Sequence, residues 1–246
     1  FTFLGEMDNV SDEKFKDALC IICDVAVSHM VSDYRYFDCK EVIVIDHPNM
    51  VDEAVAYLRT QRVLGVDTEA RPSFTRGVHY PTALVQISSL ERCYLFRLTH
   101  VGMPQALADI FSDPQICKVG LAFKDDINGL RRRRNFTPAN CVDIQSIVSK
   151  YGIMELGLQK IFAICFGKKI SKAQQLTNWE ADVLTEAQKR YAATDAWACI
   201  QIYEEILRLD ANGYMLEIIP EPEKPELPVL NEEEIEKKKK QKEQKK

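Results

Sequence analysis

The most informative stretch of the sequence is Val63-Leu64-Gly65-Val66-Asp67-Thr68-Glu69, a hydrophobic run that ends in two acids. Its apolar and β-branched residues predict a buried strand. Side chains alternate along a strand, so Asp67 and Glu69 project from the same face. Burying two carboxylates is costly unless a cation or hydrogen bonds compensate, which makes the pair a candidate metal site. Solvated acids are also common at strand ends, so the pair alone leaves both interpretations open.

Strand and helix patterns alternate around this stretch. A strand is predicted over 42–45 and a helix over 50–60. Two β-rich runs, 82–89 and 93–98, are separated by a short polar turn and predict an antiparallel hairpin. The remaining predicted elements are a helix over 103–111, a strand over 117–122, a helix through Asp126 and Leu130, and a strand over 141–144. This order predicts an α/β fold with a central mixed sheet flanked by helices.

Helical patterns dominate from Ile144 to about Leu209. The last helix is predicted to begin near Thr185, where residues 185–188 have the character of a capping box. Within that helix Tyr191 and Asp195 stand four residues apart and therefore share one face. Such a pair, taken alone, is more often part of a surface than of a site.

The two ends of the chain differ from its middle. A helix predicted over 11–31 belongs to an N-terminal helical extension, residues 1–41. Residues 42–219 form the predicted main domain. Residues 220–246 contain prolines among glutamates and then a lysine-rich end, a composition that favours a disordered tail.

Composition narrows the class of protein. The chain has 246 residues, of which 46% are hydrophobic, enough for one substantial core. A net charge of −5 argues against a chain-wide basic surface, so any nucleic-acid binding is expected to be local. The eight cysteines are scattered and favour buried reduced thiols, and the Cys20/Cys23 pair has no second pair of ligands at zinc-site spacing. Without an apolar run long enough to cross a bilayer, a soluble cytoplasmic protein is expected.

A second buried strand leads to further acids. Val119-Gly120-Leu121-Ala122 is followed by Asp125 and Asp126 at the start of the next predicted helix. Acids in that position commonly cap the helix or interact favourably with its dipole.

Taken together, these segments resemble the exonuclease motifs of the DEDDy family of 3′-5′ exonucleases. Asp67-Thr68-Glu69 after a hydrophobic strand, the Val119-Gly120 strand leading to an Asp, and Tyr-x-x-x-Asp at 191–195 follow in the family's order. Residues that are especially similar to the ribonuclease D and Werner-type exonuclease branch are Asn178-Trp179-Glu180, Leu184-Thr185, Gln188 and the run 191–196. The resemblance covers about residues 42–210 and implies a ribonuclease H-like fold.

The resemblance also implies a set of functional residues: Asp67, Glu69, Asp126 and Asp195 as ligands of two divalent cations, with Tyr191 orienting the attacking water. Asp126 is preferred to Asp125 because of its position relative to Val119-Gly120. All-oxygen ligation suits Mg²⁺ or Mn²⁺. By family likeness Asp67 bridges both ions, Glu69 and Asp195 complete the first, and Asp126 supports the second. One ion would activate water for in-line attack and the other would stabilise the leaving 3′ oxygen.

The expected substrate is a nucleic acid with a 3′ end, and a single-stranded end suits a site that must admit one terminal nucleotide. DNA and RNA are not distinguished, because no feature reads the 2′ hydroxyl. Arg131, the first of four consecutive arginines, and Lys172 are candidate phosphate contacts. Consecutive helical residues point around the axis, so at most one or two of these arginines can face the site. Trp179 is expected to be a core or loop anchor.

The function expected is a metal-dependent 3′-5′ exonuclease acting on DNA or RNA. The alternative is a nucleic-acid-binding module that keeps the fold without turnover, and a proofreading part of a polymerase assembly ranks last. Ala70 departs from the family pattern, because many relatives have an aromatic residue there, and the helical modules appended to ribonuclease D are missing. Both departures leave transfer-RNA trimming open.

Overall fold

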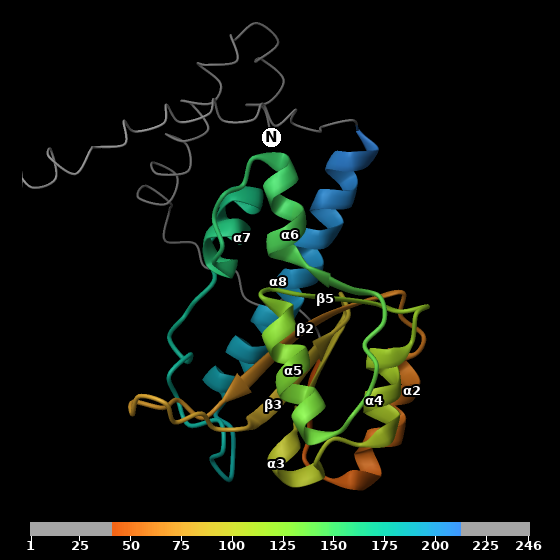
Figure 1. Cartoon of the computed structure of the whole chain (residues 1–246), viewed down its shortest axis with the longest axis vertical. Helices are drawn as coiled ribbons and strands as arrows, with labels where there is room; N and C mark the ends of the chain where they lie inside the picture. Colours follow the sequence, from red (N-terminus) through yellow and green to blue (C-terminus); the bar gives the residue numbers. More distant parts are fainter. Residues whose placement is uncertain (1–40, 213–246) are drawn as a thin grey trace, which may run out of the picture. The chain divides into compact units, whose positions relative to one another are not determined.

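The computed structural model describes residues 41–212 (Figure 1). The helix predicted over 11–31, the Cys20/Cys23 pair and the tail 220–246 lie outside these residues. The domain limits expected for the two ends therefore stay predictions.

The described part is built on a mixed sheet whose six strands have the order β1-β4-β3-β2-β5-β6. Strand β3 is antiparallel to β2 and β4, and the other neighbouring pairs are parallel. The predicted mixed sheet and the predicted hairpin are therefore both confirmed. The strands are β1 (Glu41–Ile45), β2 (Val63–Ala70), β3 (Thr82–Ser88), β4 (Arg92–Arg97), β5 (Cys117–Gly120) and β6 (Cys141–Asp143).

Helices cover both faces of this sheet. Apolar residues of α2, α4 and α5 pack with Leu64 and Val66 of β2 in one core cluster, while α6, α7 and α8 contribute to two others. Figure 1 shows α2 beside α4, and α8 as the longest helix. The helices are α2 (Val51–Leu58), α3 (Leu98–Val101), α4 (Gln105–Ser112), α5 (Phe123–Arg133), α6 (Ile144–Val148), α7 (Leu158–Phe166) and α8 (Glu186–Ala211), with 3-10 turns η1 (Pro48–Met50) and η2 (Ser149–Tyr151).

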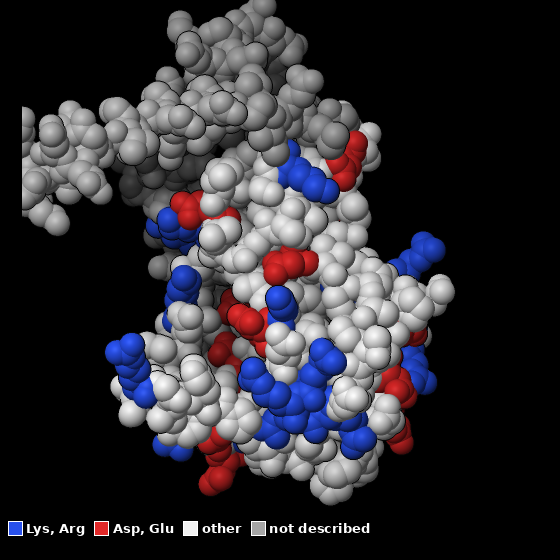
Figure 2. Space-filling view, in the orientation of Figure 1, with Lys and Arg blue, Asp and Glu red and all other residues white. Residues whose placement is uncertain are grey.

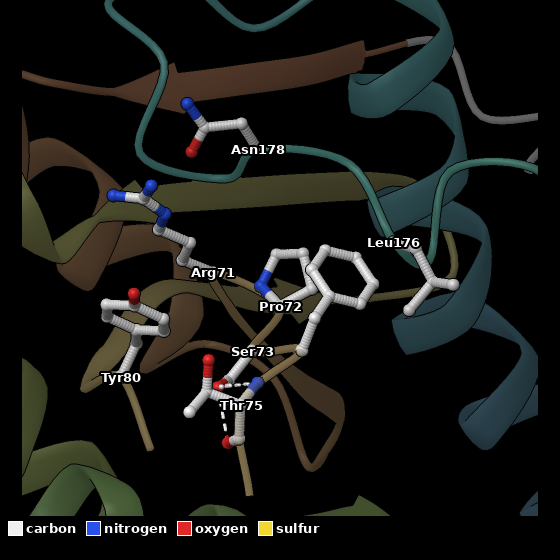
Figure 3. Close-up of a pocket in the computed structure, with 8 residues that line it drawn as sticks. Arg71, Pro72, Ser73, Thr75, Tyr80, Leu176 and Asn178 are labelled. Carbon is white, nitrogen blue, oxygen red and sulfur yellow. Dashed lines mark hydrogen bonds between the residues drawn. The ribbon is translucent and has the colours of Figure 1, made fainter. Parts of the chain in front are cut away.

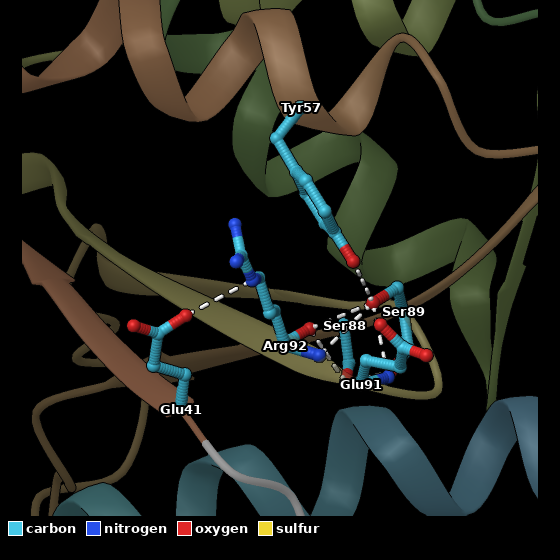
Figure 4. A network of polar contacts seen from close by, with 6 residues as sticks. All are labelled: Glu41, Tyr57, Ser88, Ser89, Glu91 and Arg92. Carbon is cyan, nitrogen blue, oxygen red and sulfur yellow. Dashed lines mark hydrogen bonds and ion pairs between the residues drawn. The ribbon is translucent and has the colours of Figure 1, made fainter.

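Side chains hold the turn of the β3–β4 hairpin. The hydroxyl oxygen of Ser89 accepts hydrogen bonds from the backbone amides of Glu91 (3.2 Å) and Arg92 (3.0 Å), and pairs with the hydroxyl of Tyr57 at 2.9 Å. Arg92 also forms a 2.9 Å ion pair with Glu41 (Figure 4). The hairpin is thereby tied to α2 on one side and to β1 on the other.

The start of α8 confirms the predicted cap. The hydroxyl of Thr185 accepts a hydrogen bond from the backbone amide of Gln188 at 3.2 Å, and the Gln188 side chain accepts one from the backbone amide of Thr185 at 3.0 Å. Both partners of the capping box are satisfied, so the helix that carries Tyr191 and Asp195 begins at a defined residue.

The prediction of helical structure from Ile144 to about Leu209 is wrong over residues 152–157 and 167–185, which form no helix. Helix α7 stops at Gly167, whose φ of 64° is left-handed and commonly ends a helix. The segment still buries Ile170, Trp179 and Leu184. The segment therefore packs on the core without forming a helix. Two smaller differences are that α3 was not predicted and that β5 ends at Gly120 rather than at residue 122.

Two expectations from composition can be checked in the described part. Of the five cysteines within residues 41–212, Cys93, Cys117 and Cys199 are buried and Cys165 is half-buried, but Cys141 is exposed, so the prediction of buried thiols is wrong at Cys141. Within the same range no helix has the length and apolar character of a membrane span.

Candidate active site

Helix α8 lies directly on β2 at Gly65. A Cβ atom at this position would overlap the backbone carbonyl oxygen of Ala196 and lie 2.8 Å from the Ile200 side chain. Leu64 and Val66 point to the opposite face, into the core beneath α2, α4 and α5. Because strand side chains alternate, the face of β2 that meets α8 also carries residues 67 and 69.

Three carboxylates meet where β2 and α8 pack together. One oxygen each of Asp67, Glu69 and Asp195 lies within 4.8 Å of the others. Glu69 is only 9% exposed and Asp195 only 8%. Just beyond Glu69 the register with β3 shifts, and such irregularities commonly redirect side chains near the end of a strand. The expected common face of Asp67 and Glu69 is therefore present, and it points at the Asp of α8.

Asp126 reaches the same strand from the other face of the sheet. The hydroxyl of Thr68 donates a 2.5 Å hydrogen bond to its carboxylate. Strand β2 pairs with β5 only over residues 63–65, so the acidic end of β2 extends past β5 and is open to α5. The neighbouring Asp125 is exposed. Of these two acids, the structure brings Asp126 to β2.

Burial raises the pKa of all four acids, and the charges of the other acids in the cluster raise it further at Asp67 and Glu69. Burial is the largest cause for Asp67, whose pKa lies well above its ordinary range, with the charges of Asp126, Asp195 and Glu69 adding to it. Burial followed by the charges of Asp195 and Asp126 raises the pKa of Glu69 to about 9. Burial raises the pKa values of Asp126 and Asp195 to about 7 each. Four carboxyl groups in this arrangement favour protonation or a cation.

Tyr191 stands one helical turn before Asp195 and is 7% exposed. Its ring lies 6.0 Å, between centroids, from that of Trp179. The buried Trp179 is a core anchor, as expected. Burial, followed by the charges of Asp195 and Glu69, raises the pKa of the Tyr191 phenol above its ordinary value, and the phenol hydrogen-bonds to Asp195. The Tyr191 hydroxyl is therefore held protonated as a hydrogen-bond donor.

Asp143 is a residue that the sequence patterns did not identify. Its carboxylate, at the end of β6, accepts hydrogen bonds from the backbone amides of Ala122 (3.1 Å) and Phe123 (2.9 Å), and also caps α6. Ala122 has a left-handed φ of 51° and no side-chain cap of its own. Asp143 therefore anchors the start of α5, the helix that carries Asp126. An acid near the end of the predicted strand 141–144 is the signal that could have found it.

The two candidate phosphate contacts occupy different positions. Lys172 is exposed, and its charge lowers the pKa of Asp195, against the larger effect of burial. Arg131 is exposed in the last turn of α5. Arg133 and Arg134 instead donate hydrogen bonds to the backbone carbonyls of Leu98 and Met103, consistent with the expectation that only part of the run is available. Figure 2 shows acidic side chains recessed beside α5 and basic side chains over that helix.

Comparisons with known proteins agree with this geometry. Residues 42–209 match the family model described as 3′-5′ exonuclease. The exonuclease 3′-5′ domain-containing protein 2 of Drosophila melanogaster is 32% identical over 163 residues, which are 65% of this chain and 28% of that protein. Ribonuclease D of Pseudomonas paraeruginosa is 31% identical over 62% of this chain and 40% of its own length. The chain thus spans less than half of either relative.

Solved structures show the same fold. The Nibbler EXO domain of Aedes aegypti has a TM-score of 0.66 at 21% identity, covering 75% of this chain and 95% of that domain. Ribonuclease D of Escherichia coli has a TM-score of 0.62 at 24% identity, covering 70% of this chain and 46% of that protein. The predicted ribonuclease H-like fold is confirmed.

Proposed function

This chain belongs to the 3′-5′ exonuclease family, and we propose that it is an active member that hydrolyses phosphodiester bonds from the 3′ end of a nucleic-acid strand. The observation that carries the proposal is the group of three carboxylates within 4.8 Å on β2 and α8. The fourth acid, Asp126, hydrogen-bonds to Thr68 between Asp67 and Glu69. A module that only binds nucleic acid has no need of buried, mutually repelling acids.

The residues fit divalent cations. The donors are all carboxylate oxygens, the ligands that Mg²⁺ and Mn²⁺ prefer. Burial, followed by the charges of neighbouring acids, raises the pKa values of Asp67 and Glu69, and bound cations would favour the charged carboxylates. Asp67, Glu69 and Asp195 would hold one ion, and Asp67 with Asp126 a second. When bound, two such ions supply an activated water and stabilise the leaving oxygen of the phosphodiester.

Tyr191 has a positioning role in this proposal. Its raised pKa makes the phenol a poor acceptor of the water's proton at neutral pH. The hydroxyl can still donate a hydrogen bond, and its contacts with Trp179 and Asp195 restrict its orientation. Tyr191 would therefore orient the attacking water without removing its proton.

The test is digestion of 3′-labelled and 5′-labelled DNA and RNA oligonucleotides with Mg²⁺, Mn²⁺ or EDTA. We expect a metal-dependent ladder that shortens from the 3′ end and is lost in Asp67→Ala and Asp195→Ala. The rate of cleavage of DNA and of RNA would identify the preferred substrate. Binding without cleavage under every metal condition would instead support the non-catalytic module. Cleavage that persists in EDTA or in Asp67→Ala would contradict the proposed metal site.

A further inference from the structure

A pocket of about 370 Å³ opens beside the acidic end of β2 (Figure 3). Ligand pockets are commonly ~300–1,000 Å³, so this one can enclose a single small unit. One wall is formed by residues that come after β2 in the sequence, and the other by residues of the irregular segment before α8. The pocket is lined by Arg71, Pro72, Ser73, Phe74, Thr75, Tyr80, Leu176 and Asn178.

Both walls continue segments that build the candidate active site. Arg71 follows Glu69 by two residues, which places their Cα atoms within roughly 7 Å of each other. On the opposite wall, Asn178 immediately precedes Trp179, whose ring lies 6.0 Å from that of Tyr191. The pocket is therefore formed by two segments that each lead within a few residues to the candidate active site.

The pocket combines a fixed cation with exposed apolar side chains. The Arg71 guanidinium lies over the Tyr80 ring at 5.0 Å and 3.8 Å from the Glu180 carboxylate. Figure 3 shows Arg71 reaching between Tyr80 and Asn178. Phe74 is 86% exposed and Leu176 68% exposed. An oriented arginine suits a phosphate, and an exposed aromatic ring suits the face of a base.

We propose that this pocket, the Arg71 pocket, binds one nucleotide of the substrate strand next to the phosphodiester held at the acidic cluster. Arg71 contacts a phosphate of the strand, and Phe74 stacks on a base. The positive charge of Arg71 also offsets the repulsion that a polyanion meets near the clustered acids. The inference rests on the proposed function in taking the ligand to be a nucleic acid.

The same pocket selects the form of the substrate. A base can stack on Phe74 only after it has left its neighbours in a duplex, and unpaired bases are free to do so. A single-stranded end therefore gains the stacking contact, whereas a paired end must first be opened. Stacking tolerates any base, so the pocket adds affinity without reading sequence.

The test places 2-aminopurine, whose fluorescence is quenched by stacking, at successive positions near the 3′ end of single-stranded oligonucleotides. Binding is followed with Ca²⁺ in place of Mg²⁺, and turnover with Mg²⁺. We expect quenching at one position, lost in Phe74→Ala and kept in Phe74→Tyr. Phe74→Ala should also raise KM by about fivefold or more, with little change in kcat.

Two matched controls separate the pocket from general surface effects. Met154 is 79% exposed and lies outside the pocket, so Met154→Ala should leave KM and quenching unchanged. Arg76 is exposed in the same loop but does not line the pocket, so Arg71→Gln should raise KM more than Arg76→Gln. Equal effects of the two arginine substitutions would contradict the phosphate contact.

The proposed pocket and the proposed exonuclease activity can be contradicted independently of each other. If Phe74→Ala gives the wild-type digestion ladder, KM and quenching, the proposed role of the pocket is wrong and the proposed activity stands. Position-specific quenching that Phe74→Ala abolishes, in a protein that cleaves nothing, would support the pocket and contradict the activity. Because Phe74 is 86% exposed, its truncation should leave the thermal unfolding temperature unchanged, which excludes misfolding as the cause.

Discussion

Gly65 on β2 lies against the backbone of Ala196 on α8, with no room between them for a Cβ atom. This close approach brings the acids of the strand to the acid that precedes Ala196 on the helix. A larger residue at position 65 would have to push α8 away from the sheet, and the three carboxylates would separate.

Gly65→Ala should therefore reduce both stability and turnover. Overpacking of this kind costs about 1–3 kcal/mol in the free energy of unfolding, and displacement of Asp195 should slow the reaction further. Gly157→Ala is the matched control, because a Cβ there meets no atom within 4 Å. Denaturant unfolding and oligonucleotide digestion of both variants test the prediction. Wild-type activity in Gly65→Ala would show that the acids do not depend on this contact.

Asp126 and Asp125 should differ sharply when each is changed to Asn. Asp126 hydrogen-bonds to Thr68, whereas Asp125 is exposed. If Asp126 helps hold a cation, Asp126→Asn should lower kcat by about 100-fold or more, since a catalytic metal supplies several kcal/mol. Asp125→Asn should retain most activity. The reverse ranking in single-turnover assays would assign the role to Asp125.

Asp143→Asn should act through the position of α5. The change removes the charge and one of the two acceptor oxygens that hold the amides of Ala122 and Phe123. We expect about a tenfold loss of activity and a higher Mg²⁺ concentration for half-maximal rate. Asp113→Asn is the matched control, because the Asp113 carboxylate also accepts a hydrogen bond from a backbone amide two residues on, that of Gln115 at 2.8 Å. An unchanged Mg²⁺ dependence in Asp143→Asn would show that α5 keeps its position without this contact.

Tyr191→Phe should lower kcat and leave the shape of the pH–rate profile unchanged. The ring that packs on Trp179 remains, and only the hydroxyl is lost. Because the phenol's pKa is raised, its ionisation does not contribute near neutral pH. The measurement is kcat from pH 6 to 9 for both proteins. Disappearance of a titrating limb in the variant would instead identify Tyr191 as the base.

The metal-free protein should lose stability as pH rises. The pKa values of Asp126 and Asp195 are about 7, and that of Glu69 is about 9, whereas unfolded carboxyl groups titrate near ~4. Between these values the native state binds more protons than the unfolded state, so the free energy of unfolding falls with increasing pH.

Thermal unfolding in EDTA should accordingly give a lower Tm at pH 8.5 than at pH 5.5. Mg²⁺ should raise Tm more at the higher pH, where the carboxylates are charged. Asp195→Asn removes one of the repelling groups and should reduce the difference between the two pH values. A metal-free Tm that rises toward pH 8.5, or a pH difference in Tm as large in Asp195→Asn as in the wild type, would contradict this electrostatic account.

Strand alternation and helical periodicity are local properties of the backbone, and they are readable in the sequence. They placed Asp67 with Glu69 on one face and Tyr191 with Asp195 on another before any fold was known. The capping box at Thr185 is local in the same sense, and it also appears as predicted. Except for α3, the order of strands and helices from 42 to 144 follows from such patterns with small differences at the ends.

The tertiary structure alone decided how these local faces meet. Gly65 lets α8 approach β2, Thr68 reaches Asp126 from the other face, and Asp143 holds the start of α5 from a neighbouring strand. The Arg71 pocket likewise joins segments about 100 residues apart in the chain. Periodicity says nothing about such pairs, because they depend on which surfaces pack together. Residues 167–185 show the same limit, since they form no helix although they bury Ile170, Trp179 and Leu184.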